Sequence, residues 1–202
     1  MWKYEKKLEC PVDIKKPDAK MAKAIMSLMG GPDGELGASQ RYLNQRFSMP
    51  FATAQAMLTD IGTEEMAHQE ILSAIIHQLT DGLSAAELEA QGLAPYYVDH
   101  TAGIYPQTGD GVPYNALAFA VKGDPVTDLH EDLAAEQKAR TTYENVLRLA
   151  KDPAVIAPLR FLREREIVHY QRFGETLGKV LDHLNSKNYY AFNPAFDPKP
   201  RR

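Results

Sequence analysis

The sequence predicts an all-α protein in which four long helices form a bundle with one long crossover connection. Apolar residues recur at helical spacing over four stretches, which cover residues 18–47, 51–79, 124–150 and 154–184. Short links join the first stretch to the second and the third to the fourth. Residues 80–123 connect the two pairs and are rich in proline and glycine. A single long crossover of this kind is typical of ferritin-like bundles.

The first stretch contains an interruption. Its first part carries apolar residues at helical spacing, namely Met21, Ala24, Ile25, Leu28 and Met29. The run Gly30-Gly31-Pro32-Asp33-Gly34 breaks the pattern, which then continues to about Phe47. We expect the glycines to admit a close approach of a neighbouring helix. Ser48-Met49-Pro50 should end the stretch.

The second stretch predicts one long helix, because it has no proline and only one glycine, Gly62. Its apolar side consists of Met57, Leu58, Ile61, Leu72, Ile75, Ile76 and Leu79. In the crossover that follows, a short helix is expected at about residues 84–91. Prolines and glycines follow it, namely Pro95, Gly103, Pro106, Gly109, Gly111 and Pro113.

The third stretch has a strong helix start, since Asp124 can cap the helix and Pro125 suits the first helical position. Lys151-Asp152-Pro153 closes this helix and opens the last one. Residues 185–202 contain three prolines and should form an extended tail. We therefore expect one domain over residues 1–184, followed by that tail.

Composition excludes several classes of protein. The formal net charge is −4 and the pI is about 5.9, so the chain lacks the basic surface that nucleic-acid binding needs. Cys10 is the only cysteine, which rules out a disulfide framework and makes a reducing compartment the default. The N-terminus lacks the features of a secretory signal, and no apolar run reaches the ~18 residues of a membrane span. We expect a soluble protein with no membrane contact.

The motif that carries chemistry is Glu-x-x-His, which occurs twice. Glu65-Met66-Ala67-His68 lies in the second predicted helix, and Glu166-Ile167-Val168-His169 lies in the fourth. Side chains three residues apart on a helix point in directions that differ by about 60°, so they share a face. Each pair can therefore contribute to one metal centre.

Both motifs interrupt an apolar stripe. In the second helix the stripe is Met57, Ile61, Glu65, His68, Leu72, Ile75 and Leu79. In the fourth helix it is Leu159, Leu162, Glu166, His169, Phe173, Val180 and Leu184. A buried carboxylate must be protonated, paired or bound to metal, and several that converge on one core favour metal.

A metal site in such a bundle needs a glutamate from each of the other two helices. On the third helix, Glu136 continues the apolar stripe, whereas Glu131 and Glu144 lie away from it. That stripe consists of Leu129, Leu133, Glu136, Tyr143 and Leu147. After the glycine run the candidate is Glu35, and Tyr42, two turns further on, is expected to donate a hydrogen bond to it.

Each candidate also has an ordinary explanation. Glu65 and Glu166 could belong to charged surface runs, and Glu136 could pair with Arg140 one turn on. The two histidines could be hydrogen-bonded core residues, but spacing and burial together favour metal. Carboxylates with imidazoles suit iron or manganese, and spacing does not choose between them. The histidines without a matching glutamate are His77, His100, His130 and His183, which we expect to be structural or solvated.

The runs around these residues resemble the non-haem manganese catalases. They are Gly34-Glu35-Leu36-Gly37-Ala38, Arg41-Tyr42-Leu43-Asn44-Gln45-Arg46, Leu58-Thr59-Asp60-Ile61-Gly62-Thr63-Glu64-Glu65-Met66-Ala67-His68 and Arg163-Glu164-Arg165-Glu166-Ile167-Val168-His169. The N-terminal run Met1-Trp2-Lys3-Tyr4-Glu5-Lys6-Lys7-Leu8 and the compact length resemble the CotJ-type spore coat members of that family. The likeness extends over residues 1–175.

The resemblance implies a catalase that uses two manganese ions and no haem. One hydrogen peroxide would oxidise paired Mn(II) to paired Mn(III) and yield water, and another would reduce the pair and yield dioxygen. In the family pattern the residue that matches Glu65 bridges the two ions. Glu35 and His68 match the residues that complete one ion. Glu136 and His169 match those that complete the other.

Two further residues match family positions that do not bind metal. Glu166 matches an outer carboxylate that acts as a general acid and base. Tyr42 matches the tyrosine beside the first glutamate. Some members carry an arginine before the third-helix glutamate where this chain has Ala135, so access to the site is expected to differ from theirs.

The resemblance also implies a homo-oligomer, typically a hexamer, which resides in the cytoplasm or in a spore coat with other coat proteins. Two alternatives stay open. The same ligands permit a ferritin-like di-iron oxidase or iron-handling protein, with iron in place of manganese. The second alternative is a coat protein whose metal site serves only to stabilise the fold. It is suggested by the aromatic run Asn188-Tyr189-Tyr190-Ala191-Phe192-Asn193-Pro194, whose rings would need a partner surface.

Overall fold

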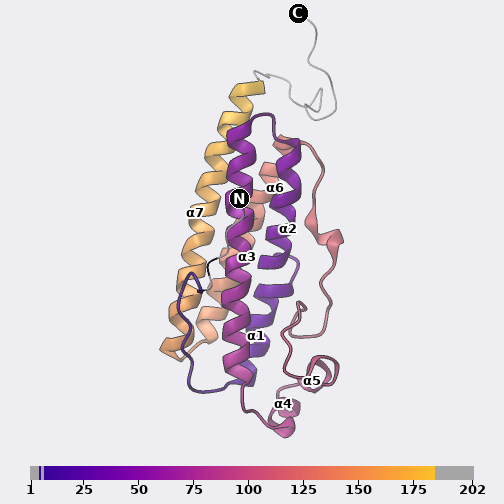
Figure 1. Ribbon diagram of the computed structural model, residues 1–202, viewed down its shortest axis with the longest axis vertical. Coiled ribbons are helices and arrows are strands. Elements are labelled where there is room, and N and C mark those ends of the chain that lie inside the picture. The colour runs from indigo at the N-terminus through magenta and orange to yellow at the C-terminus, as the bar shows by residue number, and fades with distance from the viewer. Residues whose placement is uncertain (1–4, 6, 185–202) are drawn as a thin grey trace, which may run out of the picture.

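The computed structural model describes residue 5 and residues 7–184, and this part of the chain contains helices and no strand (Figure 1). Long helices lie side by side in a bundle, and a long crossover runs along one side of it (Figure 1). The predicted all-α bundle with one crossover is confirmed. The tail expected over residues 185–202 lies outside the described residues.

The first column of the bundle consists of two helices, α1 (Ala19–Gly30) and α2 (Glu35–Gln45), which follow one another along its length (Figure 1). A Cβ atom at Gly30 would lie 2.3 Å from the backbone nitrogen of Gln107, which belongs to the crossover. Only glycine tolerates so close an approach. Gly30 therefore makes room for the crossover, whereas the sequence predicted the close approach of a helix. A 3-10 turn, η1 (Arg46–Ser48), ends the column.

The other three columns are α3 (Ala52–Thr80), α6 (Pro125–Leu149) and α7 (Pro153–Leu184). Helix α3 packs along α1 and α2, while α6 packs along α7. The side chain of Asp124 caps α6 by accepting a hydrogen bond from the first turn, as predicted. None of the helices described here combines the length and the apolarity that crossing a membrane requires.

The crossover contains three short helical segments, α4 (Ala85–Ala90), α5 (Ala94–His100) and the 3-10 turn η2 (Ala116–Phe119). Arg41 of α2 fixes its end to the bundle. The Arg41 Nε atom donates to the carbonyl oxygen of Phe119 at 2.7 Å, and Nη2 donates to that of Ala118 at 3.0 Å. These bonds from a buried guanidinium hold the crossover against α2.

Two apolar clusters fill the bundle, one towards each end. One includes Ile71, Leu72, Leu159 and Leu162, and the other includes Leu58, Ile61, Phe173 and Leu177. Along α3, Glu65 and His68 fall between the two clusters. Along α7, Glu166 and His169 do the same. The apolar packing on both sides thus encloses a polar layer in the middle of the bundle.

Candidate metal centre

Six buried polar side chains meet in this layer. They are Glu35, Glu65, His68, Glu136, Glu166 and His169, and none is more than 2% exposed. Glu35 is the first residue of α2, and Glu136 lies in the middle of α6. Helices α3 and α7 each supply a glutamate and a histidine. The structure therefore brings together all five predicted metal ligands and the predicted proton carrier.

The cluster divides into two overlapping groups, either of which could hold an ion. One group is Glu35, Glu65, His68 and Glu166, and the other is Glu65, Glu136, Glu166 and His169. Within each group, one ligand atom from every residue lies within 4.8 Å of the others. Only Glu65 and Glu166 belong to both groups. The arrangement would suit two neighbouring ions, because the two groups adjoin at Glu65 and Glu166.

Glu65 lies between the two histidines. Its Oε2 atom is 2.8 Å from Nδ1 of His68, and its Oε1 atom is 2.8 Å from Nδ1 of His169. The Oε2 atom of Glu35 is 3.8 Å from Nδ1 of His68, and Oε2 of Glu136 is 3.6 Å from Nδ1 of His169. Each histidine therefore faces the shared glutamate and one glutamate of its own.

Glu166 differs from Glu65 although it occupies the same place in its motif. Glu166 forms no ion pair with a histidine among the described residues, whereas each oxygen of Glu65 lies 2.8 Å from a histidine nitrogen. Burial raises the pKa of Glu166 well above the usual value, and the carboxylates of Glu35, Glu136 and Glu65 raise it further. The side chain is thus a carboxyl group that favours its protonated form.

Two tyrosines support the terminal glutamates, and their pairing corrects one expectation. Tyr42 donates its hydroxyl to Glu136, not to Glu35 as predicted, and Tyr143 of α6 donates to Glu35. Two turns separate Glu35 from Tyr42, which is about 10 Å along a helix and too far for a hydrogen bond. Since α2 and α6 run in opposite directions here, each helix places its tyrosine beside the glutamate of the other.

Tyr143 was not predicted as a site residue, but the sequence contained a signal for it. Tyr143 follows Glu136 by seven residues, as Tyr42 follows Glu35.

The alternative prediction, in which Glu136 pairs with Arg140, is wrong. Nη1 of Arg140 binds Oε1 of Glu144 at 2.7 Å instead.

Burial and the charges of neighbouring groups shift the pKa values within the cluster. Burial and the nearby charge of Glu65 raise the pKa of Glu35 to about 8. Burial alone would lower the pKa of His169, but Glu65 and the other carboxylates beside it raise that pKa to about 12. Burial acts against ionisation of Glu65 too, yet His169 and His68 hold its pKa below the usual value. In the absence of a cation, the cluster thus retains protons at neutral pH.

The donor atoms fit a pair of hard divalent ions. Four carboxylates and two imidazoles supply the oxygen and nitrogen ligands that manganese and iron accept. Several of these atoms are buried without a hydrogen-bond partner among the described residues, namely Glu65 Oε1, Glu136 Oε2, Glu166 Oε1 and Nδ1 of His169. Buried polar atoms of this kind are costly unless something else binds them, and metal ions between them would do so.

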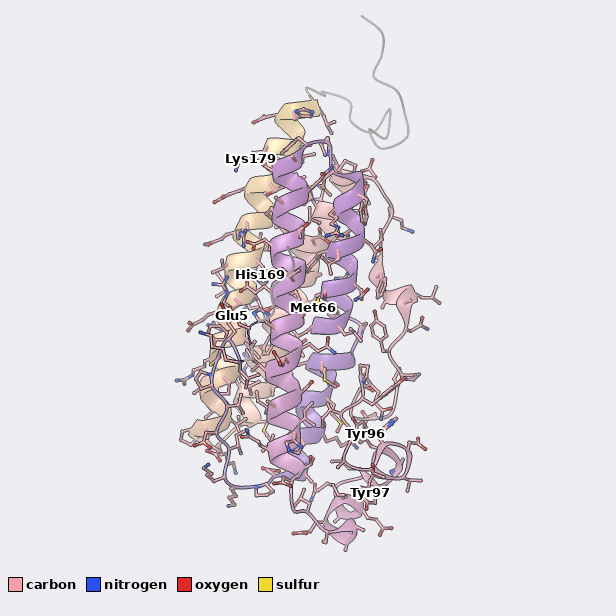
Figure 2. The ribbon with its side chains drawn as sticks, in the orientation of Figure 1. Glu5, Met66, Tyr96, Tyr97, His169 and Lys179 are labelled. Atoms are coloured by element: carbon pink, nitrogen blue, oxygen red, sulfur yellow. The ribbon has the colours of Figure 1, made fainter. Side chains whose placement is uncertain are left out.

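The outer side of the cluster, between α3 and α7, carries charged residues. Figure 2 shows His169 of α7 beside α3. Glu64 of α3 lies against both histidines, and Nε of Arg165 on α7 donates to its Oε1 atom at 2.5 Å. Sequence reasoning missed Glu64, which reads as a surface neighbour of Glu65.

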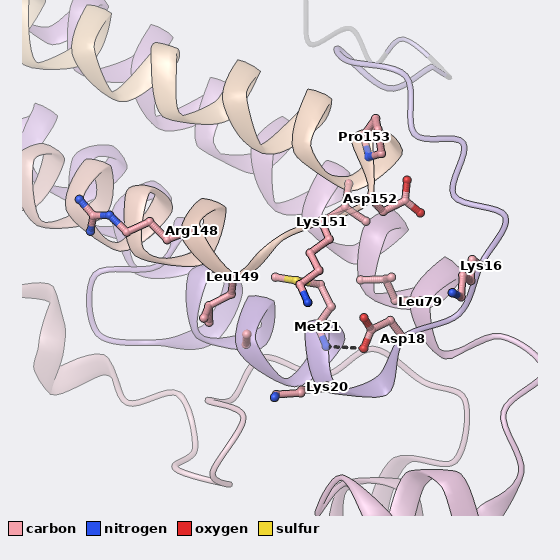
Figure 3. Close-up of a pocket in the computed structure, with 12 residues that line it drawn as sticks. Lys16, Asp18, Lys20, Met21, Leu79, Arg148, Leu149, Lys151, Asp152 and Pro153 are labelled. Atoms are coloured by element: carbon pink, nitrogen blue, oxygen red, sulfur yellow. Dashed lines mark hydrogen bonds between the residues drawn. The ribbon is translucent and has the colours of Figure 1, made fainter.

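A surface cavity of about 720 Å³ lies at one end of the bundle, where α1 begins and α6 ends (Figure 3). Met21 and Leu149 line it together with Lys20 and Lys151. None of the six clustered residues lines this cavity. The cavity is therefore separate from the candidate metal centre.

The chain is similar in sequence to proteins of known family. The chain is 43% identical over 190 residues to protein CotJC of Bacillus subtilis (strain 168), an alignment that covers 94% of this chain and all of that protein. It is 32% identical over 200 residues to a probable manganese catalase of Clostridium acetobutylicum, covering 94% of this chain and 85% of the relative.

A solved structure shows the same fold. The crystal structure of KatB, a manganese catalase from Anabaena, superposes with a TM-score of 0.82 at 30% identity, covering 100% of this chain and 88% of KatB. The bundle is therefore ferritin-like, as predicted. Residues 1–188 also match the family of manganese containing catalases. The chain belongs to the manganese catalase family.

Proposed function

We propose that this protein is a manganese catalase, which converts hydrogen peroxide to water and dioxygen at two manganese ions. The proposed ligands are Glu35, Glu65, His68, Glu136 and His169. The position of Glu65 carries the proposal, because each of its oxygens lies 2.8 Å from the Nδ1 atom of a different histidine. A carboxylate placed in this way can bridge two ions, and each ion then has a histidine and a terminal glutamate of its own.

The manganese pair would supply the chemistry of electron transfer, taking two electrons from one peroxide and returning two to the next. The remaining work falls to the side chains. Glu166 can hold a proton because its pKa is raised, and it can pass that proton to a peroxide oxygen and recover it later. Protons released in one half of the cycle are then available for the other half.

The surroundings of the centre support this role. Tyr42 and Tyr143 hold the two terminal glutamates in place through hydrogen bonds that ligand exchange need not disturb. Apolar clusters on both sides limit the volume available to a substrate. A small neutral molecule such as hydrogen peroxide suits so enclosed a site better than a larger organic substrate does.

Oxygen evolution tests the proposal. Metal-free protein would be loaded with manganese, checked for two ions per chain, and mixed with hydrogen peroxide in an oxygen electrode. We expect one dioxygen for every two peroxides, and no such activity from metal-free protein. Protein that carries two manganese ions and evolves no oxygen would contradict the proposal.

Iron is the principal competitor for the same donor atoms. We propose manganese on the strength of the family and of the 32% identical probable manganese catalase. Elemental analysis of protein from its own source separates the two metals. Predominant iron, with oxidation of Fe(II) and no oxygen evolution, would establish the ferritin-like alternative.

We also propose that the protein associates with a spore coat and forms a homo-oligomer, a hexamer if it follows its family. The first part rests on the 43% identity to CotJC. The homo-oligomer is supported by large apolar side chains that the crossover exposes, because such side chains often mark contacts between proteins. Leu117, for example, is 90% exposed. Light scattering that gave only the 22.6 kDa mass of one chain would contradict the homo-oligomer.

A further inference from the structure

The outward-facing nitrogens of both candidate histidine ligands meet one carboxylate. Nε2 of His68 lies 3.6 Å from Oε1 of Glu64, and Nε2 of His169 lies 3.3 Å from Oε2 of the same residue. Both Nε2 atoms are buried and have no hydrogen-bond partner among the described residues. Each oxygen of Glu64 is therefore aimed at a different imidazole.

The Glu64 carboxylate is itself fixed by the neighbouring helix. The Arg165 Nε atom donates to Oε1 of Glu64 at 2.5 Å, which ties α7 to α3 beside the centre. The side chain of Glu64 is only 14% exposed, so this ion pair is largely shielded from solvent. Glu9 of the N-terminal segment adds a second carboxylate near His68, with its Oε2 atom 3.8 Å from Nε2. His169 has Glu64 as its neighbour on this side.

A histidine that binds a metal through one ring nitrogen usually donates a hydrogen bond from the other. A histidine that binds a metal through Nδ1 carries its proton on Nε2, and that proton almost always goes to a carboxylate, a carbonyl or water. The acceptor fixes the orientation of the ring and makes the other nitrogen a better ligand. In this chain the Nδ1 atoms point to Glu65, and the Nε2 atoms point to Glu64.

We propose that Glu64 is a positioning residue that accepts the Nε2 protons of both histidines and so holds both halves of the centre with one side chain. The inference rests on the proposed function for the identity of the ions. It requires no contact between Glu64 and substrate. Because the two imidazoles share one acceptor, the loss of Glu64 weakens both halves together, while a terminal glutamate serves only its own half.

The Glu64→Gln substitution tests the proposal with little change in size. Glutamine offers one acceptor oxygen, which can serve only one imidazole at a time, so neither ring keeps a permanent acceptor. We expect the variant to hold manganese about 10-fold to 100-fold more weakly, as is usual when such an acceptor is lost. After a chelator challenge, the electron paramagnetic resonance spectrum should change from that of a coupled pair to that of isolated Mn(II).

Asp60→Asn provides a matched control. Asp60 lies one turn before Glu64 and also joins α3 to α7, since Nη2 of Arg172 binds its Oδ2 atom at 2.5 Å. Asp60 belongs to none of the groups of described residues that could hold a metal ion. The control should retain manganese like the parent protein. Equal retention by Glu64→Gln and Asp60→Asn would overturn the proposal.

A second variant keeps the test decisive if Glu64→Gln does not fold. Arg165→Gln leaves the Glu64 carboxylate in place but removes its tether, and we expect manganese to be lost faster than from Asp60→Asn. Loss at the same rate as the control would overturn the role of the tether. Oxygen evolution is not the readout, so a parent protein that binds two ions without evolving oxygen would refute the catalase and leave this test intact.

Discussion

The Glu-x-x-His motifs of α3 and α7 are the same in spacing, burial and place within an apolar stripe, yet their glutamates differ. Glu65 of α3 has a histidine nitrogen 2.8 Å from each of its oxygens. Glu166 of α7 is instead dominated by burial and by the carboxylates of Glu35, Glu136 and Glu65, which together raise its pKa well above the usual value. Spacing along one helix decides which side chains share a face, but the neighbouring helices decide what those side chains meet. The two glutamates therefore suit different work.

The largest expected effect comes from removing the carboxylate that both halves share. Glu65→Gln should lose both manganese ions and with them all oxygen evolution, because its amide cannot bridge two cations as a carboxylate does. The loss in affinity should exceed the roughly 100-fold that follows the removal of an outer partner. Metal analysis after gel filtration measures it.

Glu164→Gln is the control for this variant, since Glu164 is an exposed glutamate on α7. It should retain two manganese ions per chain. The bridging role of Glu65 would be wrong if Glu65→Gln retained as much metal as Glu164→Gln.

A smaller effect should follow the loss of a tyrosine hydroxyl, and it should fall on one half of the site. Tyr143→Phe removes the donor to Glu35, and Tyr42→Phe removes the donor to Glu136. Each substitution should lower the affinity for one of the two manganese ions by about 10-fold to 100-fold. Anomalous scattering at the manganese edge from crystals of each variant identifies which ion has been lost. Depletion of the same ion in both variants would contradict the crossed pairing.

A further prediction concerns the pH dependence of metal uptake. The pKa of Glu35 is raised to about 8 and that of His169 to about 12, so both groups hold protons at neutral pH in metal-free protein. Metal must displace these protons, and the affinity should therefore rise as pH rises, by about 10-fold per pH unit for each proton released. Manganese titrations at about pH 6 and about pH 8 measure this change. Equal affinity at both values would contradict these protonation states.

Much of the fold could be predicted because it depends on local patterns. The apolar spacing of each helix, the Asp124 cap and the proline-rich crossover are all visible along the chain. The convergence of the candidate ligands followed from their position in apolar stripes, since a polar residue in such a stripe must meet others in the core.

The sequence predicted the wrong contact, or none, where the packing of distant segments decides which residues meet. The partner of Tyr42 depends on how far α2 is shifted along α6, and that shift brings Glu136 to the tyrosine hydroxyl. Glu64 looks like a solvated residue in the sequence, because only the packing of α7 brings Arg165 and His169 to it. Likewise, nothing local to Gly30 indicates that its close neighbour is the crossover at Gln107.

The division of labour between the two motifs is tested most directly by Glu166→Gln. Manganese content and oxygen evolution would be measured on the same preparation. We predict that the variant keeps two manganese ions per chain and loses activity by about 100-fold or more, as expected for the loss of a general acid and base. A variant that loses its metal, or one that keeps both its metal and full activity, would contradict the separate roles of Glu65 and Glu166.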